Sequence, residues 1–388
     1  MTIRNIENVD VCGKYVLLRD DFNVQIVDGK ISEPFRIDAS QPTIKYLTSN
    51  GARVVICAHL GRPKGVKDES LSLRTIAEYM KIPFIDDCLK KDFLQNMKNG
   101  DVVLLENLRF YIGEEENTDL FAQDLSQGFD LYVNDAFAVS HRDAASVVGI
   151  TKYLPSFAGF LLEKEINNIS RVMEKPEHPL VAFVGGGKVS TKIGVLKKFV
   201  SIADKIVVGG AMGTTFNYAL GLPVGNSLYE ASMKNIALEI LDMARKNNCE
   251  ILLPLDKAVG KSFSKDEMRI NRDIDKIQEN DVIMDDGDKT IERNKKLLEN
   301  AKMVIWNGTF GVTEWGEKWG RASFAFAKSL AFFSKSGKLE SVVGGGDTVA
   351  VLNDCGVFDN MTYVSTGGGA FLEFIEGKEL PGIKALEQ

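Results

Sequence analysis

The sequence is poor in the residues that build disulfide frameworks and multi-histidine metal sites. Its 388 residues include five cysteines and three histidines, and no two cysteines stand in a C-x-x-C spacing. Scattered thiols of this kind are typical of a reduced, cytoplasmic protein, whereas disulfide scaffolds and zinc sites use closely and regularly spaced cysteines. We therefore expect a cytoplasmic protein without a disulfide framework or a zinc site.

Long apolar runs and an excess of positive charge are absent as well. No stretch of about 18 apolar residues occurs, so we expect no membrane span. The first residues, MTIRNIENVDVCGKYV, match neither a secretory signal nor an Arg- and Ser-rich transit peptide. The formal net charge of −7 argues against nucleic acid as the main partner. A local cluster of arginines can still bind a small anion on an acidic protein.

Short apolar runs alternate with helical patterns along the whole chain. Runs such as KYVLLRDDFN and ARVVICAHLGR in the first half, and LVAFVGGGK and MVIWNGTFG in the second, are typical of strands buried on both faces of a parallel sheet. Helix-like segments such as EASMKNIALEILDMARKNN lie between them. This alternation predicts an α/β fold with doubly wound parallel sheets. At about 150 residues per domain, the length favours two or three domains.

One amphipathic segment near the middle of the chain predicts a domain boundary. The stretch PSFAGFLLEKEINNISRVMEKPEHP indicates a single helix that ends before Pro176. Such a helix would join two α/β halves of similar size. The alternative is an ordinary surface helix within one domain.

In the first half of the chain, polar and cationic side chains follow each apolar run. Ligands of open α/β sheets bind beyond the carboxyl ends of the strands, so these side chains are candidates for a binding site. Several guanidinium groups in one cleft would bind a phosphorylated or carboxylated small molecule bidentately. The alternative is that surface loops carry arginine by chance. The residues are Arg19, Asp21, Asn23, Arg36, His59, Arg62, Arg109, His141 and Arg142.

In the second half, glycines follow the apolar runs. Backbone N–H groups exposed at helix N-termini suit phosphate binding. Lys188 and Lys192 lie four apart and are predicted on one face of a helix that starts at Ser190, with Ser190 or Thr191 as an alternative N-cap. An aspartate at a strand end near phosphates is a natural Mg²⁺ ligand. The glycine-led segments are 185–188, 209–211, 344–347 and 367–370.

The glycine patterns differ from two common nucleotide fingerprints. In G-x-G-x-x-G, the third glycine would stand where Ser190 is, and in the P-loop pattern Gly187–Lys188 would be followed by Ser or Thr instead of Val189. A dinucleotide site and a P-loop are therefore both disfavoured. The residues favour a small-anion site in one half, a magnesium nucleotide in the other, and phosphoryl transfer between them.

Nine motifs also occur in the order found in one enzyme family: LLRDDFNV, AHLGRP, LLENLRFY, NDAFAVSHR, AGFLLEKE, GGGKVSTKIGVL, VIWNGTFGV, VVGGGDT and STGGGAFLEFIEGKELPG. With them the chain resembles the phosphoglycerate kinases along nearly its whole length. The resemblance implies two Rossmann-like, doubly wound domains joined by a hinge helix. Residues 1–157 with a returning tail at about 377–388 would bind 3-phosphoglycerate, residues 158–175 would form the hinge helix, and residues 176–376 would bind the nucleotide.

The resemblance further implies a cytoplasmic monomer of glycolysis and gluconeogenesis, with no nucleic acid or membrane partner. It would transfer a phosphoryl group reversibly between 1,3-bisphosphoglycerate with ADP and 3-phosphoglycerate with ATP, using Mg²⁺ and direct in-line transfer on domain closure. Two other readings of the sequence stay open. A nicotinamide-dependent dehydrogenase would need the dinucleotide fingerprint, and a catalytically inactive paralogue would serve as a binding or regulatory protein.

Site residues follow from the resemblance by motif position. Those implied to bind 3-phosphoglycerate are Asp21, Asn23, Arg36, His59, Arg62, Arg109 and Arg142, with Arg36 as the catalytic arginine. Those implied to bind the nucleotide phosphates and magnesium are Lys188, Lys192, Asn307, Gly344, Gly345, Gly346, Asp347 and Thr348, with Asp347 as the metal ligand. Glu314 would bind the ribose, and Gly186, Gly187, Gly209, Gly210 and Val312 would line the adenosine pocket. Lys188 and the helix start at Gly367, Gly368 and Gly369 are implied to act in catalysis.

The sequence departs from the family pattern at six positions. Asp20 replaces a valine and Gln25 a proline in the first motif, and an extra acid beside Asp21 would weaken anion binding unless it points away or pairs with Arg19. The remaining departures are Asp143 and Ala144 in the arginine loop, Asp288 in MDDGDKT and Thr309 in WNGTFGV.

Overall fold

The computed structural model describes residues 3–387, and the chain divides into two compact units. The first unit is discontinuous in sequence: it comprises the chain up to Asn167 and the chain from Lys378 onward. The second unit comprises Asn168–Gly377. The boundary between them falls within helix α6 (Phe160–Glu174). Residues 1, 2 and 388, at the outer ends of the predicted first domain, lie outside the described residues.

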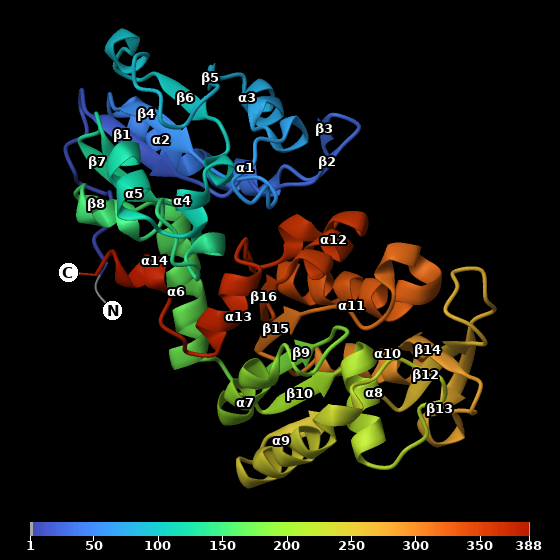
Figure 1. Ribbon diagram of the computed structural model, residues 1–388. Helices are drawn as coiled ribbons and strands as arrows, with labels where there is room; N and C mark the ends of the chain where they lie inside the picture. Colours follow the sequence, from blue (N-terminus) through green and yellow to red (C-terminus); the bar gives the residue numbers. More distant parts are fainter. Residues whose placement is uncertain (1–2, 388) are drawn as a thin grey trace. The chain divides into compact units, whose positions relative to one another are not determined.

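The first unit is built on a six-stranded parallel sheet (Figure 1). Counted along the chain, its strands lie in the order 3-4-2-1-5-6, so β1 is central and has β4 on one side and β7 on the other. The winding direction therefore reverses beside β1, where ligands of such sheets bind. From edge to edge the strands are β5 (Phe84–Ile85), β6 (Val102–Leu105), β4 (Arg53–Cys57), β1 (Tyr15–Arg19), β7 (Leu131–Asn134) and β8 (Ser156–Ala158).

Helices cover both faces of this sheet because its strands are apolar on both sides. Val16 and Leu18 pack with residues of α2 and α3, whereas Leu17 packs with residues of α5. The alternation of neighbouring residues between two cores is the two-residue period of a strand. The helices of this unit are α1 (Phe35–Ala39), α2 (Gln41–Ser49), α3 (Arg74–Met80), α4 (Ile112–Glu115), α5 (Asp119–Ser126) and α14 (Pro381–Lys384), and β2 (Ile26–Val27) and β3 (Lys30–Ile31) form a hairpin.

The end of the chain belongs to the first unit. Ile3 and Glu387 form an antiparallel bridge, and Gly382 at the start of α14 donates its amide hydrogen to the carbonyl oxygen of Ser140. A Cβ on Gly382 would lie 2.5 Å from Val147, so the close approach of α14 requires glycine here.

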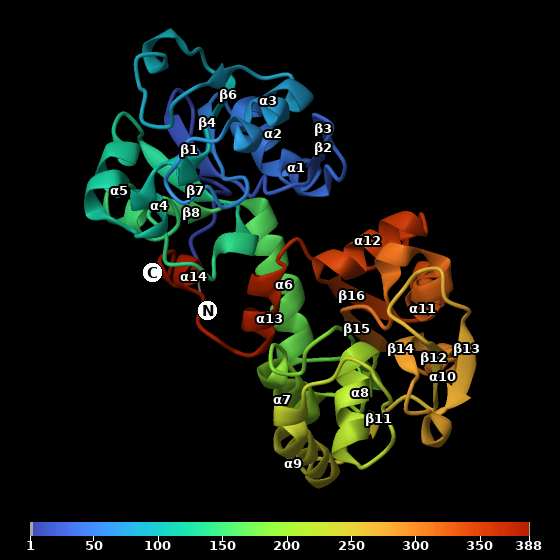
Figure 2. The same cartoon turned by 45° about the vertical axis from the view of Figure 1, so that its right-hand side comes forward.

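The second unit has its own six-stranded parallel sheet, of which Figure 2 labels β11, β15 and β16. Counted along the chain, its strands lie in the common doubly wound order 3-2-1-4-5-6. The winding direction reverses between β9 and β15, the two central strands. From edge to edge the strands are β11 (Glu250–Leu252), β10 (Lys205–Val208), β9 (Leu180–Val184), β15 (Met303–Asn307), β16 (Glu340–Gly344) and β17 (Tyr363–Val364).

An aromatic core lies on one face of the second sheet. Phe183 of β9 and Trp306 of β15 contact Phe326 of α11, with ring centroids 4.1 and 5.0 Å apart. Residues of α10 and α12 join this core, and α7 packs against β9 and α9. The helices are α7 (Ile193–Ile202), α8 (Gly210–Ala219), α9 (Lys234–Lys246), α10 (Asp288–Leu297), α11 (Glu317–Lys335), α12 (Gly346–Asp354) and α13 (Gly369–Ile375).

A small antiparallel sheet completes the second unit. Its order is β13 (Ile270–Asp273), β12 (Asp256–Gly260) and β14 (Val282–Asp286), and β14 contacts α8 and α11. The predicted α/β fold with two parallel sheets is confirmed, and the small sheet was not predicted. No helix in the described part of the chain combines the length and apolar content of a membrane span.

Candidate active site

The predicted anion-binding residues of the first unit lie beyond the carboxyl ends of its central strands. Arg36 is the exception, because it lies in the short helix α1 and not directly after a strand of the sheet. The carboxyl ends of parallel strands meet at one edge of the sheet, so residues distant in sequence come together there. Asp21 and Asn23 follow β1, His59 and Arg62 follow β4, Arg109 lies in the turn η3 (Leu108–Phe110) after β6, and Arg142 follows β7.

Asp21 is the centre of a hydrogen-bond network among these residues. Its Oδ2 accepts a hydrogen bond from Nη1 of Arg36 at 2.7 Å, and its Oδ1 accepts from the amide of Asn23 at 3.0 Å. Asn23 Oδ1 accepts from the amide of Gly61 at 2.9 Å, and Arg109 Nη1 donates to the Gly61 carbonyl at 2.7 Å. Four predicted residues are thereby joined through one loop.

His59 is buried within this network and is uncharged at neutral pH. Burial and the neighbouring guanidinium groups, Arg19 first among them, lower the pKa of His59 well below its ordinary value. Its Nδ1 lies 3.4 Å from Nη2 of Arg19 and 3.7 Å from Oδ1 of Asp21. The neutral ring can accept from Arg19, so the contact with Asp21 is not an ion pair. The positive charge of the site is therefore supplied by arginine.

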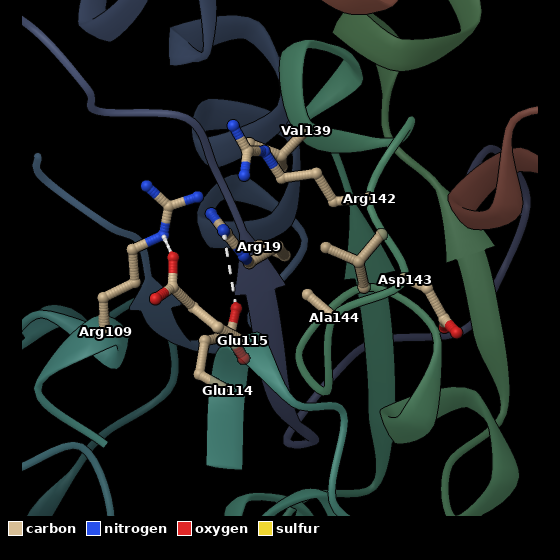
Figure 3. A pocket seen from close by; sticks show the side chains of 9 residues that line it. Arg19, Arg109, Glu114, Glu115, Val139, Arg142, Asp143 and Ala144 are labelled. Carbon is tan, nitrogen blue, oxygen red and sulfur yellow. Dashed lines mark ion pairs between the residues drawn. The ribbon is translucent and has the colours of Figure 1, made fainter. Parts of the chain in front are cut away.

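Three arginines line a cavity of about 250 Å³ in the first unit. Figure 3 shows the guanidinium groups of Arg19, Arg109 and Arg142 gathered on one side of it. Oε1 of Glu115 lies 3.4 Å from Nε of Arg109, and Oε1 of Glu114 lies 3.9 Å from Nη2 of Arg19. Burial and the other two arginines lower the pKa of Arg109 to about 10, which leaves it charged at pH 7.

Two arginines of the prediction have no recorded side-chain partner within residues 3–387. Arg142 lines the cavity without an ion pair or hydrogen bond there, so its donors are free to bind an anion. Arg62 is exposed and forms no side-chain hydrogen bond or ion pair with the network in the described residues. The structure thus brings Arg142 to the cavity and leaves Arg62 outside the hydrogen-bonded group.

Arg19 was a strand-end candidate but was not among the residues that the resemblance implies to bind 3-phosphoglycerate. It is fully buried, its Nε donates to Ser146 Oγ at 2.7 Å, and its Nη1 donates to the carbonyl oxygen of Asp20. The signal in the sequence was its place as the last residue of β1, beside the point where the winding reverses.

The extra acid at Asp20 is buried and faces a second buried carboxyl group. Neither carboxylate oxygen of Asp20 has a hydrogen-bond partner in the described structure, and Oδ2 of Asp135 also has none. Burial and then the charge of Asp135 raise the pKa of Asp20, and burial raises the pKa of Asp135 to about 7. Arg19 contacts the backbone of Asp20, so the expected alternative of a side-chain pair with Arg19 is wrong.

In the second unit, Lys192 lies where the winding of the sheet reverses. Its Nζ donates to the carbonyl oxygen of Gly185 after β9 at 2.7 Å and to that of Asn307 at the end of β15 at 3.1 Å. Burial lowers the pKa of Lys192 to about 8, and Asp347 partly offsets this. The Asn307 side-chain amide donates to the Gly344 carbonyl at 2.7 Å, so three strand ends are linked.

A largely apolar cavity of about 290 Å³ opens beside these strand ends. Its lining is Gly-rich on one side and includes large apolar side chains such as Phe263, Met284 and Phe310. That combination suits a flat base attached to a polar sugar phosphate. Of the predicted residues, those that line it are Gly186, Gly187, Gly210, Val312, Glu314 and Asp347, whereas Lys188, Lys192, Gly209, Asn307, Gly344, Gly345, Gly346, Thr348, Gly367, Gly368 and Gly369 do not.

The triple glycine before Asp347 has three different roles. A Cβ on Gly344 would lie 2.7 Å from the ring of Phe371, and Gly345 has φ +101°, which disfavours any side chain. A Cβ on Gly346, the first residue of α12, would meet nothing within 4 Å. Packing and backbone conformation therefore account for the first two glycines, and only Gly346 leaves open space for a ligand.

The prediction for Lys188 and Lys192 is wrong in its local structure. Helix α7 begins at Ile193, so both lysines precede it and share no helix face. Ser190 is not the N-cap of α7, since Lys192 holds that position, and its amide and its hydroxyl both donate to the carboxylate of Glu230, at 3.0 and 2.5 Å. The contact between Ser190 and Glu230, which lie 40 residues apart, thus keeps this segment a loop where a first helical turn was predicted.

Two ion pairs of the second unit were missed, one fully buried and one with a partly buried arginine. Lys257 Nζ lies 2.7 Å from Asp286 Oδ1, and Arg269 Nη1 lies 2.9 Å from Asp285 Oδ2. For Lys257 and Asp286 the only signal was charged residues inside the strand patterns DKAVG and MDDGD, whereas Arg269 precedes its strand and gave none.

A resident metal ion would need several protein ligands. Within residues 3–387, no group of three or more His, Cys, Asp or Glu side chains is placed to hold one. Asp347 lines the cavity and belongs to no such group, which fits magnesium that arrives with nucleotide phosphates and keeps several of its waters.

Comparisons with known proteins agree with this arrangement. A family model described as phosphoglycerate kinase matches residues 6–378. The chain belongs to the phosphoglycerate kinase family. It is 42% identical over 398 residues to a phosphoglycerate kinase of Borrelia garinii subsp. bavariensis and 42% identical over 397 residues to one of Bartonella henselae, with full coverage of both chains in each case.

Solved structures of the phosphoglycerate kinase family share the fold. The chain matches the enzyme from Coxiella burnetii with a TM-score of 0.87 and 38% identity, over 99% of each chain. It matches the enzyme from Pyrococcus horikoshii with a TM-score of 0.85 and 31% identity, over 99% of this chain and 98% of that one. The resemblance stated from the motifs is therefore confirmed.

Proposed function

We propose that the first unit binds 3-phosphoglycerate and that the second binds the nucleotide of a phosphoglycerate kinase reaction. As a member of this family the chain is a glycolytic phosphotransferase with a carboxyl group as acceptor. It transfers a phosphoryl group reversibly between 1,3-bisphosphoglycerate with ADP and 3-phosphoglycerate with ATP. The main support for the proposed sites is that the free donors of Arg142 and the partly buried Lys192 each lie where a sheet reverses its winding.

For the acceptor, the arginines supply charge and fixed orientation. Arg142 and Arg109 would bind its anionic groups, and Asn23 and His59 would contribute hydrogen bonds, because they share one loop network with Asp21. Asp21 holds Arg36 in place at 2.7 Å in the free protein. Arg36 would leave Asp21 to stabilise the charge on the phosphoryl group as it moves.

For the nucleotide, Lys192 and Lys188 would bind phosphate oxygens, and Glu314 would bind the ribose at the cavity wall. Magnesium, when bound with the nucleotide at Asp347, neutralises phosphate charge. Asn307 and Thr348 link the ends of β15 and β16, since the Asn307 side chain donates to the Gly344 carbonyl oxygen and Gly308 donates its amide hydrogen to Thr348 Oγ1 at 2.7 Å. The backbone amides of Gly368 and Gly369, where α13 begins, would face the transferred group, and Gly367 holds this turn by donating its amide hydrogen to Ser365 Oγ at 3.0 Å.

Direct in-line transfer requires the reacting atoms to approach to about 3–3.5 Å. Each ligand binds one unit, so only the two together favour a closed state in which water is excluded. Small-angle scattering should give a smaller radius of gyration with 3-phosphoglycerate plus a nonhydrolysable Mg-nucleotide than with either ligand alone. The same radius of gyration in the free protein, with either ligand and with both ligands, in an active preparation, would refute closure.

We also propose that the protein is a cytoplasmic monomer.

The two-site assignment is tested by titration calorimetry on an Arg142→Ala variant. Loss of a hydrogen bond to a charged group costs about 1.5–3 kcal/mol, so 3-phosphoglycerate affinity should fall about 10- to 150-fold. Mg-ADP affinity should stay unchanged, because Arg142 belongs to the other unit. A Lys152→Ala variant, which removes an exposed pair with Asp119, is the matched control. Wild-type 3-phosphoglycerate affinity in Arg142→Ala would refute the assignment.

A further inference from the structure

A charged pair is buried next to the nucleotide cavity without lining it. Lys257 of β12 and Asp286 at the end of β14 form it, with Nζ and Oδ1 2.7 Å apart and side-chain exposures of 0% and 1%. Neither residue lines the cavity, although Met284 and Asp285 of the same strand do. Two charges taken out of water are costly to bury, and such a pair adds little stability over apolar side chains of similar size. Its contacts indicate another use.

The pair touches both glycines at the start of α8. Lys257 Nζ donates a second hydrogen bond to the carbonyl oxygen of Gly210 at 3.2 Å. Asp286 packs against Gly209, where a Cβ would lie 2.9 Å from Oδ2 of the carboxylate. Gly210 and Ala211 line the cavity, so the buried pair contacts the backbone that forms one of its walls.

The contact with Gly210 helps to fix where the next amide points, together with Thr214 Oγ1, which donates to the same carbonyl oxygen at 3.4 Å. The carbonyl oxygen of Gly210 and the N–H of Ala211 belong to one planar trans peptide and point in opposite directions. Ala211 lies in the first turn of α8, where N–H groups have no helical acceptor, and no backbone acceptor in the described residues is recorded for its amide. Gly210 has φ +63° and no side chain of its own to fix this peptide.

We propose that Lys257, held by Asp286, is a positioning residue for the nucleotide: it fixes the Gly210–Ala211 peptide so that the Ala211 amide donates a hydrogen bond to an acceptor of the bound nucleotide. The inference rests on the proposed nucleotide site in this cavity. The inference adds a charged pair that lies outside the cavity and sets the affinity for the nucleotide through the backbone of Gly210 and Ala211.

The test replaces the pair by apolar residues of similar size in a Lys257→Met, Asp286→Leu double variant. This change removes both charges together, so no uncompensated charge is left buried. The matched control is Lys261→Met. The side chain of Lys261 is half-exposed and its Nζ lies 2.8 Å from Oδ1 of Asp281. Asp281 keeps a partner in this variant, because Nε of Arg272 lies 2.6 Å from its Oδ2. Mg-ADP and 3-phosphoglycerate affinities are measured by calorimetry, and steady-state rates are measured with Mg-ATP.

The double variant should bind Mg-ADP roughly five- to tenfold more weakly, the size of one net hydrogen bond. KM for Mg-ATP should rise with kcat nearly retained, and affinity for 3-phosphoglycerate should not change. Lys261→Met should match the wild type in all three. A folded double variant with wild-type Mg-ADP affinity would overturn the proposal, whereas a wild-type protein that binds no Mg-ADP would instead overturn the proposed function.

A second measurement does not depend on the double variant folding. Hydrogen exchange of the Ala211 amide in the wild-type protein should be fast in the free state and slow with saturating Mg-ADP. An exchange rate that Mg-ADP leaves unchanged would overturn the proposed hydrogen bond.

Discussion

Lys192 predicts that nucleotide affinity depends on pH in an alkaline range. Its amine donates to the carbonyl oxygens of Gly185 and Asn307 on a partly buried side chain, and desolvation there lowers its pKa to about 8. At this pKa, roughly nine-tenths of the lysine is charged at pH 7 and roughly one-tenth at pH 9. If only the charged form binds phosphate well, Mg-ADP affinity falls by up to about tenfold over this range, or about 1.4 kcal/mol.

The assay is calorimetric titration of Mg-ADP at pH 7 and pH 9, with two variants for comparison. Lys192→Arg keeps a charge that does not titrate below pH 12, so its affinity should not fall with pH in this way. Lys192→Met lacks the charge and should bind weakly and equally at both values. A wild-type affinity that is equal at pH 7 and pH 9, or an equal fall in Lys192→Met, would refute the reasoning.

Three further predictions concern single side chains. Arg62→Ala should weaken 3-phosphoglycerate binding about tenfold if this exposed arginine closes onto the substrate, and an unchanged titration would remove it from the site. Asp347→Ala should lower kcat strongly with the fold intact, and near wild-type turnover at modest magnesium would show that Asp347 holds no metal. Burial raises the carboxyl pKa values of Asp20 and Asp135, the latter to about 7, so they stabilise the fold at acid pH and this contribution is lost as pH rises from about 4 through 7. The unfolding temperature should therefore fall less from pH 5 to pH 8 in Asp20→Asn than in the wild type, and equal falls would contradict the raised pKa values.

The strand-end residues could be predicted from the sequence because a parallel sheet brings one end of every strand together. Asn23 follows β1 and Arg109 follows β6, yet both bond to Gly61, which follows β4 between these two strands. A run of buried residues with a charged residue at its end is a local pattern, and the fold class converts it into a shared site.

Contacts between distant segments could not be predicted in the same way. Ser190 is followed by a helical pattern, but Glu230 takes both of its donors and delays the start of α7 to Ile193. Lys257 and Asp286 lie on neighbouring strands of a small antiparallel sheet, whose pairing depends on the register of two strands and not on either one. A charged residue within a single strand gives no indication of its partner.

The strand order of the first sheet also lay beyond the sequence pattern. The short strand β5 pairs at the edge with β6, although β6 follows it along the chain and could have taken the edge position. Periodicity identifies strands and helices, whereas the order of strands is decided by which faces pack.

The central claim is that this chain moves a phosphoryl group between ATP and 3-phosphoglycerate. The most direct test follows 1,3-bisphosphoglycerate formed by the purified protein from 3-phosphoglycerate and Mg-ATP, with Arg36→Ala measured beside the wild type. We expect turnover that requires both substrates and magnesium and that is lost in Arg36→Ala with substrate binding largely kept. A folded wild-type protein that binds both ligands and forms no product would contradict the account and favour an inactive paralogue.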